Sequence, residues 1–112
     1  MSEIILSTLG LFFFAAVLEI GGGYLVWKWL RDHKTKIFGL VGALILFSYG
    51  IIMTLQPAGF GKVYATYGGI FVVSSIIWGY WIDKKKPDKF EILGSIIVLI
   101  GVFIIFYFPR DL

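Results

Sequence analysis

Residues 4–27 read IILSTLGLFFFAAVLEIGGGYLVW, an apolar stretch in which Glu19 is the one charged side chain. An α-helix needs about 20 predominantly apolar residues to cross the hydrocarbon core of a bilayer, so this stretch is long enough to span one. A carboxylate at that depth is unfavourable by about 3 kcal/mol on insertion scales, and a chain that keeps one aims it at a partner or a water-filled cavity. We therefore predict that Glu19 binds or moves something within the membrane.

The rest of the chain follows the same apolar pattern. The protein has 112 residues, of which 59% are hydrophobic and 15% are charged. A soluble domain of this length cannot bury so much apolar surface. We predict an all-α membrane protein with a single domain, residues 1–112, in which short loops join four transmembrane helices. The helices are expected at about residues 4–29, 37–55, 58–82 and 90–108.

The basic residues indicate how the helices are oriented. The first and third loops share eight lysines and arginines: Lys28, Arg31, Lys34, Lys36, Lys84, Lys85, Lys86 and Lys89. The opposite side of the membrane has only Lys62 and Arg110. The positive-inside rule therefore places loops 31–36 and 83–89 in the cytoplasm and both termini outside. Most of the aromatic residues beside these loops are interpreted as interfacial anchors: Trp27, Trp29, Trp78, Tyr80 and Trp81.

The composition also argues against several classes of function. The chain has no cysteine, which excludes disulfides and thiolate metal sites. Its net charge of +3 comes from lysines at helix ends, where they contact lipid headgroups, and does not indicate nucleic acid. No set of catalytic residues and no phosphate-binding loop is visible, so we expect neither an enzyme nor a cofactor or metal. Residues 1–3 lack the basic start of a signal peptide, so the first helix is expected to be retained.

Small residues line the helix face around Glu19. Residues three, four and seven apart share a face of a helix, and here they are Phe12, Ala15, Ala16, Gly22, Gly23 and Val26. Small side chains let another helix or a flat ligand approach the carboxylate closely. One carboxylate holds either a proton or a cation, and this competition is the minimal requirement for proton-coupled antiport. The alternative is a glutamate that only holds a helix interface together through a hydrogen bond.

The third expected helix begins with two tyrosines followed by two glycines. Tyr64 and Tyr67 lie one turn apart, so their rings and hydroxyls can contact a cation or a carboxylate. Gly68 and Gly69 thin the helix and allow it to bend. The alternative is that both tyrosines only anchor the helix at the membrane surface.

The fourth expected helix carries Gly94 and Gly101, seven residues apart on one face. Small residues with this spacing let helices pack closely in a membrane. We expect this face to pack against another helix, within the chain or in a second copy, and assign it to a dimer contact.

Several short motifs together resemble one known family. They are Glu19-Ile20-Gly21-Gly22, Gln56-Pro57, Gly61-Lys62-Val63-Tyr64-Ala65 and Tyr67-Gly68-Gly69. In these motifs, and in length and loop placement over essentially the whole chain, the sequence resembles the YnfA family of bacterial inner-membrane proteins. That family is similar in turn to the small multidrug resistance transporters, the EmrE-like members of the drug/metabolite transporter superfamily.

The resemblance implies a small multidrug resistance-like bundle that acts as a dimer in the bacterial inner membrane. In those transporters a first-helix glutamate exchanges protons for lipophilic or guanidinium-type cations, and that role falls on Glu19. Tyr64 and Tyr67 match the aromatic positions, although Tyr67 replaces a tryptophan that is usual there. Gly69 matches the first of two bending glycines, whereas the second position is Phe71 here.

The expected depths of these residues bear on how a dimer is arranged. Glu19 lies far along the first helix, whereas Tyr64 and Tyr67 lie near the start of the third. At 1.5 Å per residue they would be separated by roughly 10–15 Å in depth within one chain. An inverted partner would bring its glutamate level with these tyrosines, but the bias in basic residues argues against inverted copies. A parallel homodimer, an antiparallel homodimer and a heterodimer all stay open.

The sequence thus favours a small proton-coupled exporter of organic cations, with Glu19 as the shared site for proton and cation. One alternative is a non-transporting accessory or assembly subunit that pairs Glu19 with a basic residue of another protein. Another is a subunit of a lipid-carrier flippase, for which an acidic site is poorly suited. Binding of cations that weakens at low pH distinguishes the exporter from the accessory subunit.

Overall fold

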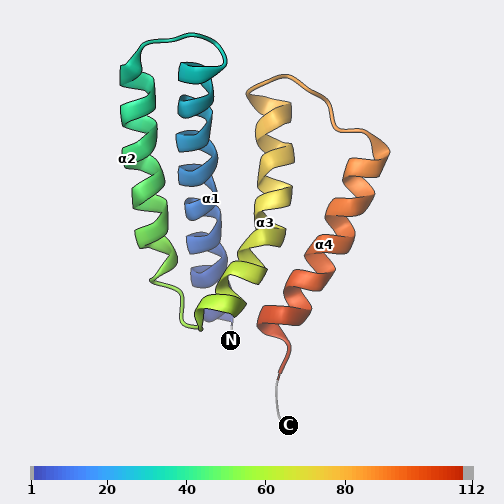
Figure 1. Ribbon diagram of the computed structural model, residues 1–112. Coiled ribbons are helices and arrows are strands. Elements are labelled where there is room, and N and C mark those ends of the chain that lie inside the picture. Colours follow the sequence, from blue (N-terminus) through green and yellow to red (C-terminus); the bar gives the residue numbers. More distant parts are fainter. Residues whose placement is uncertain (1, 110–112) are drawn as a thin grey trace.

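The computed structural model describes residues 2–109, and all four expected helices are present (Figure 1). They are α1 (Ser2–Leu30), α2 (Lys36–Met53), α3 (Phe60–Trp81) and α4 (Lys89–Tyr107). Each is long and apolar enough to cross a membrane, and the described residues include no strand. The prediction of an all-α bundle of four membrane-spanning helices is therefore confirmed. Arg110, one of the two basic residues expected on the outer side, lies outside the described residues.

Local interactions set where the helices begin and end. The Asp88 carboxylate accepts a hydrogen bond from the backbone N–H of Glu91 (2.8 Å), and the Glu91 carboxylate accepts one from that of Asp88 (3.0 Å). This capping box satisfies two N–H groups that the first turn of α4 leaves without a partner. In the loops after α1 and α3, His33 and Lys84 have φ angles of 58° and 60°, which turn the chain sharply. Such short loops make consecutive helices antiparallel.

The four helices form two antiparallel pairs (Figure 1). α1 packs along α2, α3 packs along α4, and the two pairs meet where α1 contacts α3. Glycines make the first pair tight, because a Cβ at Gly22 would lie 2.9 Å from the carbonyl oxygen of Gly42, and one at Gly42 would lie 2.7 Å from that of Gly22. The two backbones can touch here because neither residue has a side chain. The close approach expected at Gly22 therefore occurs within one chain.

Gly22→Ala is expected to destabilise the protein, because the added methyl group would collide with the backbone of α2. Overpacking of this kind costs about 1–3 kcal/mol, so the melting temperature in detergent should fall. Gly10→Ala is the matched control, because nothing lies within 4 Å of a Cβ at Gly10 in the same helix. Equal melting temperatures for the two variants would contradict the tight contact between α1 and α2.

The core lies where α1 crosses α3. Phe12, Ala15 and Ala16 are fully buried there, so this part of the Glu19 face of α1 packs against protein. Tyr67 and Ile70 are 4% and 1% exposed and supply the matching face of α3. Many other large apolar side chains are exposed. A continuous apolar surface of this kind is typical of a protein that lipid surrounds.

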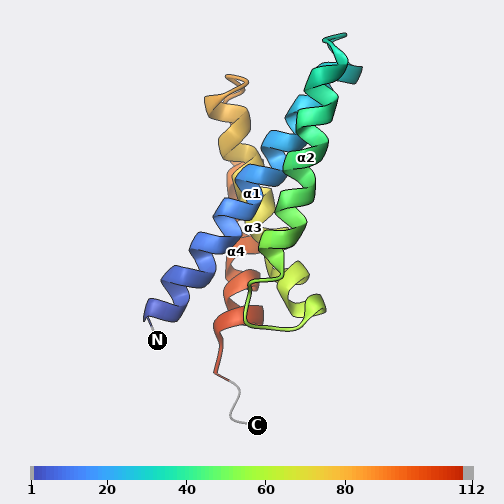
Figure 2. The same ribbon diagram turned by 90° about the vertical axis from the view of Figure 1, so that its left-hand side faces the viewer.

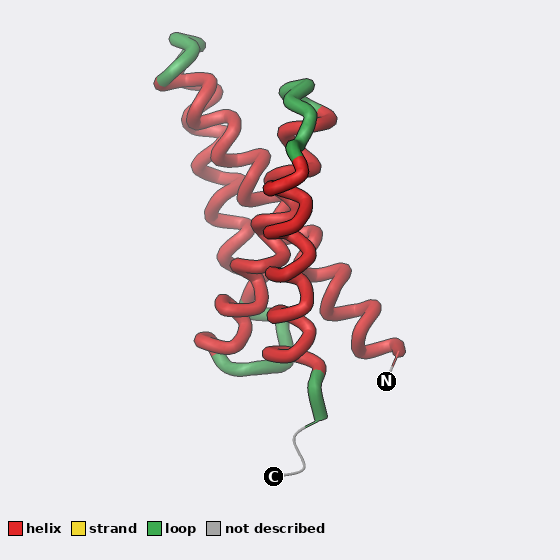
Figure 3. Tube along the Cα trace, turned by 90° about the vertical axis from the view of Figure 1, so that its right-hand side faces the viewer, coloured by secondary structure: helices red, strands yellow, loops and turns green. Residues whose placement is uncertain are grey.

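α1 is inclined to the other helices, so its first turns project away from the bundle (Figures 2 and 3). Thr8 nevertheless ties this part of α1 to two distant segments. Its hydroxyl is hydrogen-bonded to the hydroxyl of Tyr107, and its carbonyl oxygen accepts a hydrogen bond from Nε2 of Gln56 at 3.0 Å. α4 contacts mainly α3, where Val102 occupies the space that a Cβ at Gly69 would need.

Candidate functional site

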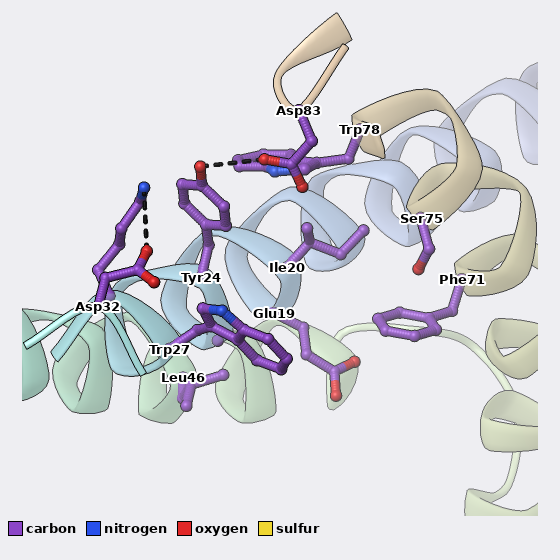
Figure 4. Close-up of a pocket in the computed structure, with 12 residues that line it drawn as sticks. Glu19, Ile20, Tyr24, Trp27, Asp32, Leu46, Phe71, Ser75, Trp78 and Asp83 are labelled. Carbon is purple, nitrogen blue, oxygen red and sulfur yellow. Dashed lines mark hydrogen bonds and ion pairs between the residues drawn. The ribbon is translucent and has the colours of Figure 1, made fainter. Parts of the chain in front are cut away.

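A hollow of about 780 Å³ opens beside Glu19. Its lining comes from α1, α2, α3 and the loops after α1 and α3: Glu19, Ile20, Gly23, Tyr24, Trp27, Lys28, Asp32, Leu46, Phe71, Ser75, Trp78 and Asp83. Figure 4 shows Glu19 and Phe71 on one side of it and Asp32 and Asp83 on the other. The hollow therefore runs from Glu19 to the end of the bundle that carries the basic loops. Its volume is typical of small-molecule sites, which span about 300–1,000 Å³.

Glu19 is held by Tyr67, which is another predicted site residue. The hydroxyl of Tyr67 donates a hydrogen bond to Oε1 of Glu19 at 2.7 Å. A hydrogen bond to a carboxylate is charge-assisted and stronger than one between neutral groups. Because the ring of Tyr67 is buried, its hydroxyl has little freedom and orients the carboxylate.

The expected separation in depth does not keep the side chains of Glu19 and Tyr67 apart. A distance of roughly 10–15 Å follows only if both helices run straight along the bundle at 1.5 Å per residue. α1 is inclined instead (Figure 2), so each of its residues advances less along the bundle. The long glutamate and tyrosine side chains then cover the remaining distance. The pair forms within one chain and needs no inverted partner.

Aromatic rings enclose Tyr67. The centre of its ring lies 6.4 Å from that of Phe12 and 5.8 Å from that of Phe71. A third ring, that of Tyr49 in α2, lies 5.4 Å away. Sequence reasoning missed Tyr49, whose one signal was a hydroxyl within an apolar run. The structure adds it to the surroundings of the site.

Tyr64 does not line the Glu19 hollow. It lines a second hollow of about 230 Å³, together with Met53, Thr54, Gln56, Ala58, Phe60 and Val63. The centre of its ring lies 4.4 Å from that of Phe60, and its side chain also lies beside Tyr49. Tyr64 therefore lies beside Tyr49, which packs against the Tyr67 ring that holds Glu19.

The predicted glycines differ in their surroundings. Gly23 lines the Glu19 hollow, where the missing side chain leaves room beside the carboxylate. Gly69 packs under Val102 of α4, so a Cβ does not fit there. α3, which contains Gly69, changes direction along its length (Figure 1). At the other three glycines no atom lies within 4 Å of a Cβ position: Gly68, Gly94 and Gly101.

Aromatic side chains make up much of the wall of the Glu19 hollow: Tyr24, Trp27, Phe71 and Trp78. The rings of Tyr24 and Trp78 meet edge to face, with centres 5.7 Å apart. The sequence suggests only interfacial anchors at Trp27 and Trp78, but both face this hollow. Aromatic faces attract cations through their quadrupole, most strongly in tryptophan.

The charges of the lining favour a cation as well. It holds three carboxylates, Glu19, Asp32 and Asp83, against one amine, Lys28. Lys28 pairs with Asp32 at 3.3 Å, and within residues 2–109 neither Glu19 nor Asp83 forms an ion pair. Asp83 instead accepts a hydrogen bond from the hydroxyl of Tyr24 at 3.1 Å. In the described part of the chain no three His, Asp or Glu side chains gather to hold a metal ion.

Comparison with known sequences identifies the family. A family model described as "Uncharacterised BCR, YnfA/UPF0060 family" matches residues 4–111. A UPF0060 membrane protein of Clostridium beijerinckii is 59% identical over 110 residues, which cover 96% of this chain and 98% of that relative. The UPF0060 membrane protein YfjF of Bacillus subtilis is 51% identical over 106 residues, which cover 94% and 97%. No solved structure matches the chain. The resemblance to YnfA proteins is thus confirmed, and the chain belongs to the YnfA/UPF0060 family of membrane proteins.

Proposed function

We propose that the protein is a proton-coupled exporter of organic cations, lipophilic or of the guanidinium type, that works as a dimer in the bacterial inner membrane. The observation that supports this most directly is the hydrogen bond from Tyr67 to Glu19 at the deep end of an aromatic-lined hollow. A carboxylate among aromatic faces suits a cation that is partly apolar. The likeness of the YnfA motifs to those of small multidrug resistance transporters agrees with this function.

Glu19 is the shared site for proton and cation. As a carboxylate it accepts the hydrogen bond from Tyr67 and attracts a cation, whose apolar part rests against Phe71 and Trp78. A proton on Glu19 removes the charge and therefore the attraction. Proton and cation exclude each other, and this exclusion couples their movements in opposite directions.

The hollow supplies the route by which the cation enters. It opens at the end of the bundle with loops 31–36 and 83–89, which the positive-inside rule places in the cytoplasm. A cytoplasmic cation meets Asp32 and Asp83 first and then passes Trp78 to reach Glu19. For release on the other side, the α1–α2 pair rocks against the α3–α4 pair around Glu19, as in other transporters with a midplane site. The contact between α1 and α3 is the joint for this motion.

A second copy of the chain completes the pathway through α4. This helix contacts mainly α3, and no atom lies within 4 Å of a Cβ at Gly94 or Gly101. Both glycines leave room for the close approach of a helix from another protomer. Because Glu19 and Tyr67 meet within one chain, the site does not depend on an antiparallel arrangement of the dimer.

Purified protein in detergent is expected to bind lipophilic and guanidinium-type cations, and binding should weaken as the pH falls. Because one proton competes with one cation, the apparent Kd should rise by up to about tenfold per pH unit where Glu19 takes up its proton. Trp27 and Trp78 line the hollow, so their fluorescence reports its occupancy. A Kd that does not change with pH would contradict competition at Glu19.

The two rival functions give different outcomes in the same preparation. An accessory subunit would bind no cation alone and would copurify with a partner protein that supplies a basic residue to Glu19. A flippase subunit would act on an anionic lipid carrier, which the three carboxylates of the lining disfavour. A folded protein that binds none of the cations would favour the accessory subunit.

A further inference from the structure

The second hollow adjoins the first along α3. Phe71 lines the Glu19 hollow, whereas Tyr64 lines the smaller one of about 230 Å³ near the α2–α3 loop. Tyr67 lies between these two residues in the helix, is 4% exposed and lines neither hollow. The two hollows are therefore lined by different parts of α3, with Tyr67 between these parts in the sequence.

One residue that lines the second hollow, Gln56, has a buried amide oxygen without a partner among residues 2–109. Gln56 is 7% exposed, and its Nε2 donates a hydrogen bond to the carbonyl of Thr8 at 3.0 Å, which fixes the orientation of the amide. Within residues 2–109 the Oε1 of Gln56 has no hydrogen-bond partner. A buried acceptor left in this state carries an energetic cost, because it has lost its hydrogen bonds to water. A ligand with an N–H group that reaches Oε1 removes part of this cost.

The remaining lining of the second hollow is aromatic or uncharged. The ring centres of Phe60 and Tyr64 lie 4.4 Å apart and present two π surfaces. The amine of the neighbouring Lys62 points to α4, where it lies 5.2 Å from the centre of the Phe106 ring. The hollow thus combines an acceptor with aromatic faces and has no carboxylate in its lining. These groups attract a cation without holding it tightly.

We propose that the second hollow is a weaker cation subsite, in which Gln56, Phe60 and Tyr64 bind guanidinium or a primary ammonium group. Its volume of about 230 Å³ suits a small ion or the charged head of a larger one. Oε1 of Gln56 accepts a hydrogen bond from the cation, and the rings of Phe60 and Tyr64 face its charge. The role of the subsite in export rests on the proposed function: it receives the cation that a proton displaces from Glu19.

Titration of Glu19→Gln protein with guanidinium chloride tests the subsite when the main site is removed. The readout is the NMR signal of ¹³C-labelled tyrosine rings, with the Tyr64 signal identified by its loss in Tyr64→Phe. We expect this signal to shift and saturate at millimolar guanidinium in both the wild type and Glu19→Gln, with similar apparent Kd values. A shift that grows linearly, or that sodium chloride reproduces, would overturn the subsite.

Gln56→Met and tetramethylammonium test the role of the amide oxygen. Methionine keeps the length of the side chain but removes the acceptor, so the guanidinium affinity reported by Tyr64 should fall at least about fivefold. Tetramethylammonium has no N–H group, so wild type and Gln56→Met should bind it equally. Should Gln56→Met not fold, the affinities of guanidinium and tetramethylammonium for Glu19→Gln protein test the hydrogen bond instead. Equal affinities would then exclude a hydrogen bond to Gln56.

Two further comparisons identify the source of the cation and separate this subsite from the proposed function. An ethanolamine lipid headgroup carries the same ammonium chemistry. The first comparison uses nanodiscs without guanidinium, in which phosphatidylcholine is replaced by phosphatidylethanolamine. A shift of the Tyr64 signal on this replacement would assign the subsite to the ethanolamine headgroup. A shift that saturates with guanidinium in detergent assigns the subsite to a dissolved cation.

The second comparison sets proton release at Glu19 beside the Tyr64 signal. Loss of proton release with the Tyr64 shift intact would refute export and leave the subsite standing. Proton release without a Tyr64 shift would refute the subsite alone.

Discussion

Glu19→Gln is expected to abolish the proton release that follows addition of an organic cation to the solubilised protein. At a pH where the empty site holds its proton, the wild type should release up to about one proton per cation bound, because the cation binds only the ionised carboxylate. Glutamine has nearly the same shape, and its carbonyl oxygen still accepts the hydrogen bond that Tyr67 donates to Glu19. It cannot titrate, so no proton is available for release. The measurement uses a pH indicator in weakly buffered detergent solution during stepwise addition of the cation.

Glu3→Gln is the matched control for this experiment. Glu3 lies exposed in the first turn of α1, so its replacement should leave proton release unchanged. The melting temperature of Glu19→Gln should stay close to that of the wild type, because the hydrogen bond to Tyr67 survives. Transport with its normal pH dependence in Glu19→Gln would show that the glutamate only holds the helix interface together.

Tyr67→Ala is expected to have the second-largest effect. The substitution removes an aromatic ring that is 4% exposed and leaves a cavity between α1 and α3. Replacement of a buried aromatic residue by alanine costs about 3–5 kcal/mol. The melting temperature should therefore fall strongly, and cation binding should be lost because Glu19 is no longer oriented. Thermal unfolding and tryptophan fluorescence titration in detergent measure both effects.

Tyr67→Phe separates the hydroxyl of this residue from its ring. The ring contacts with Phe12 and Tyr49 remain, so stability should fall less than in Tyr67→Ala. The lost hydrogen bond to a charged group is worth about 1.5–3 kcal/mol, so proton-driven cation uptake into proteoliposomes should fall at least about tenfold. Tyr80→Phe is the control, because Tyr80 is exposed and lines neither the Glu19 hollow nor the second one. Uptake by Tyr67→Phe at the wild-type rate would remove the hydroxyl from the mechanism.

The fold could be predicted from the sequence because lipid leaves few choices. Backbone groups in the hydrocarbon core must be satisfied within the same segment, so an apolar stretch of sufficient length becomes a helix. Polar and proline-containing loops then mark where each helix stops, and short loops make neighbours antiparallel. The inclination of α1 was not predictable in this way (Figure 2). The helix crosses α3 where Phe12, Ala15 and Ala16 are buried, and Glu19 meets Tyr67 within the same chain.

The candidate site was predictable only where one residue carried the signal. Glu19 is a charge in an apolar run, and Tyr67 belongs to a motif that can be read along one helix. Tyr49 and Trp78 contribute through contacts between helices, which spacing along a single helix does not encode. In the sequence, Gln56 resembles an ordinary loop residue. The structure shows that it is buried and that its amide oxygen has no hydrogen-bond partner among residues 2–109.

The order of biosynthesis gives the packing of α4 mainly against α3 a further meaning. α4 contacts mainly α3, and every residue that lines the Glu19 hollow lies in or before the loop that precedes α4. The Tyr67 hydroxyl and its bond to Glu19 likewise involve only α1 and α3. A nascent chain that has inserted three helices therefore already contains the whole site. In the proposed dimer, α4, which follows these three helices in the chain, supplies a surface for assembly rather than a part of the chemistry.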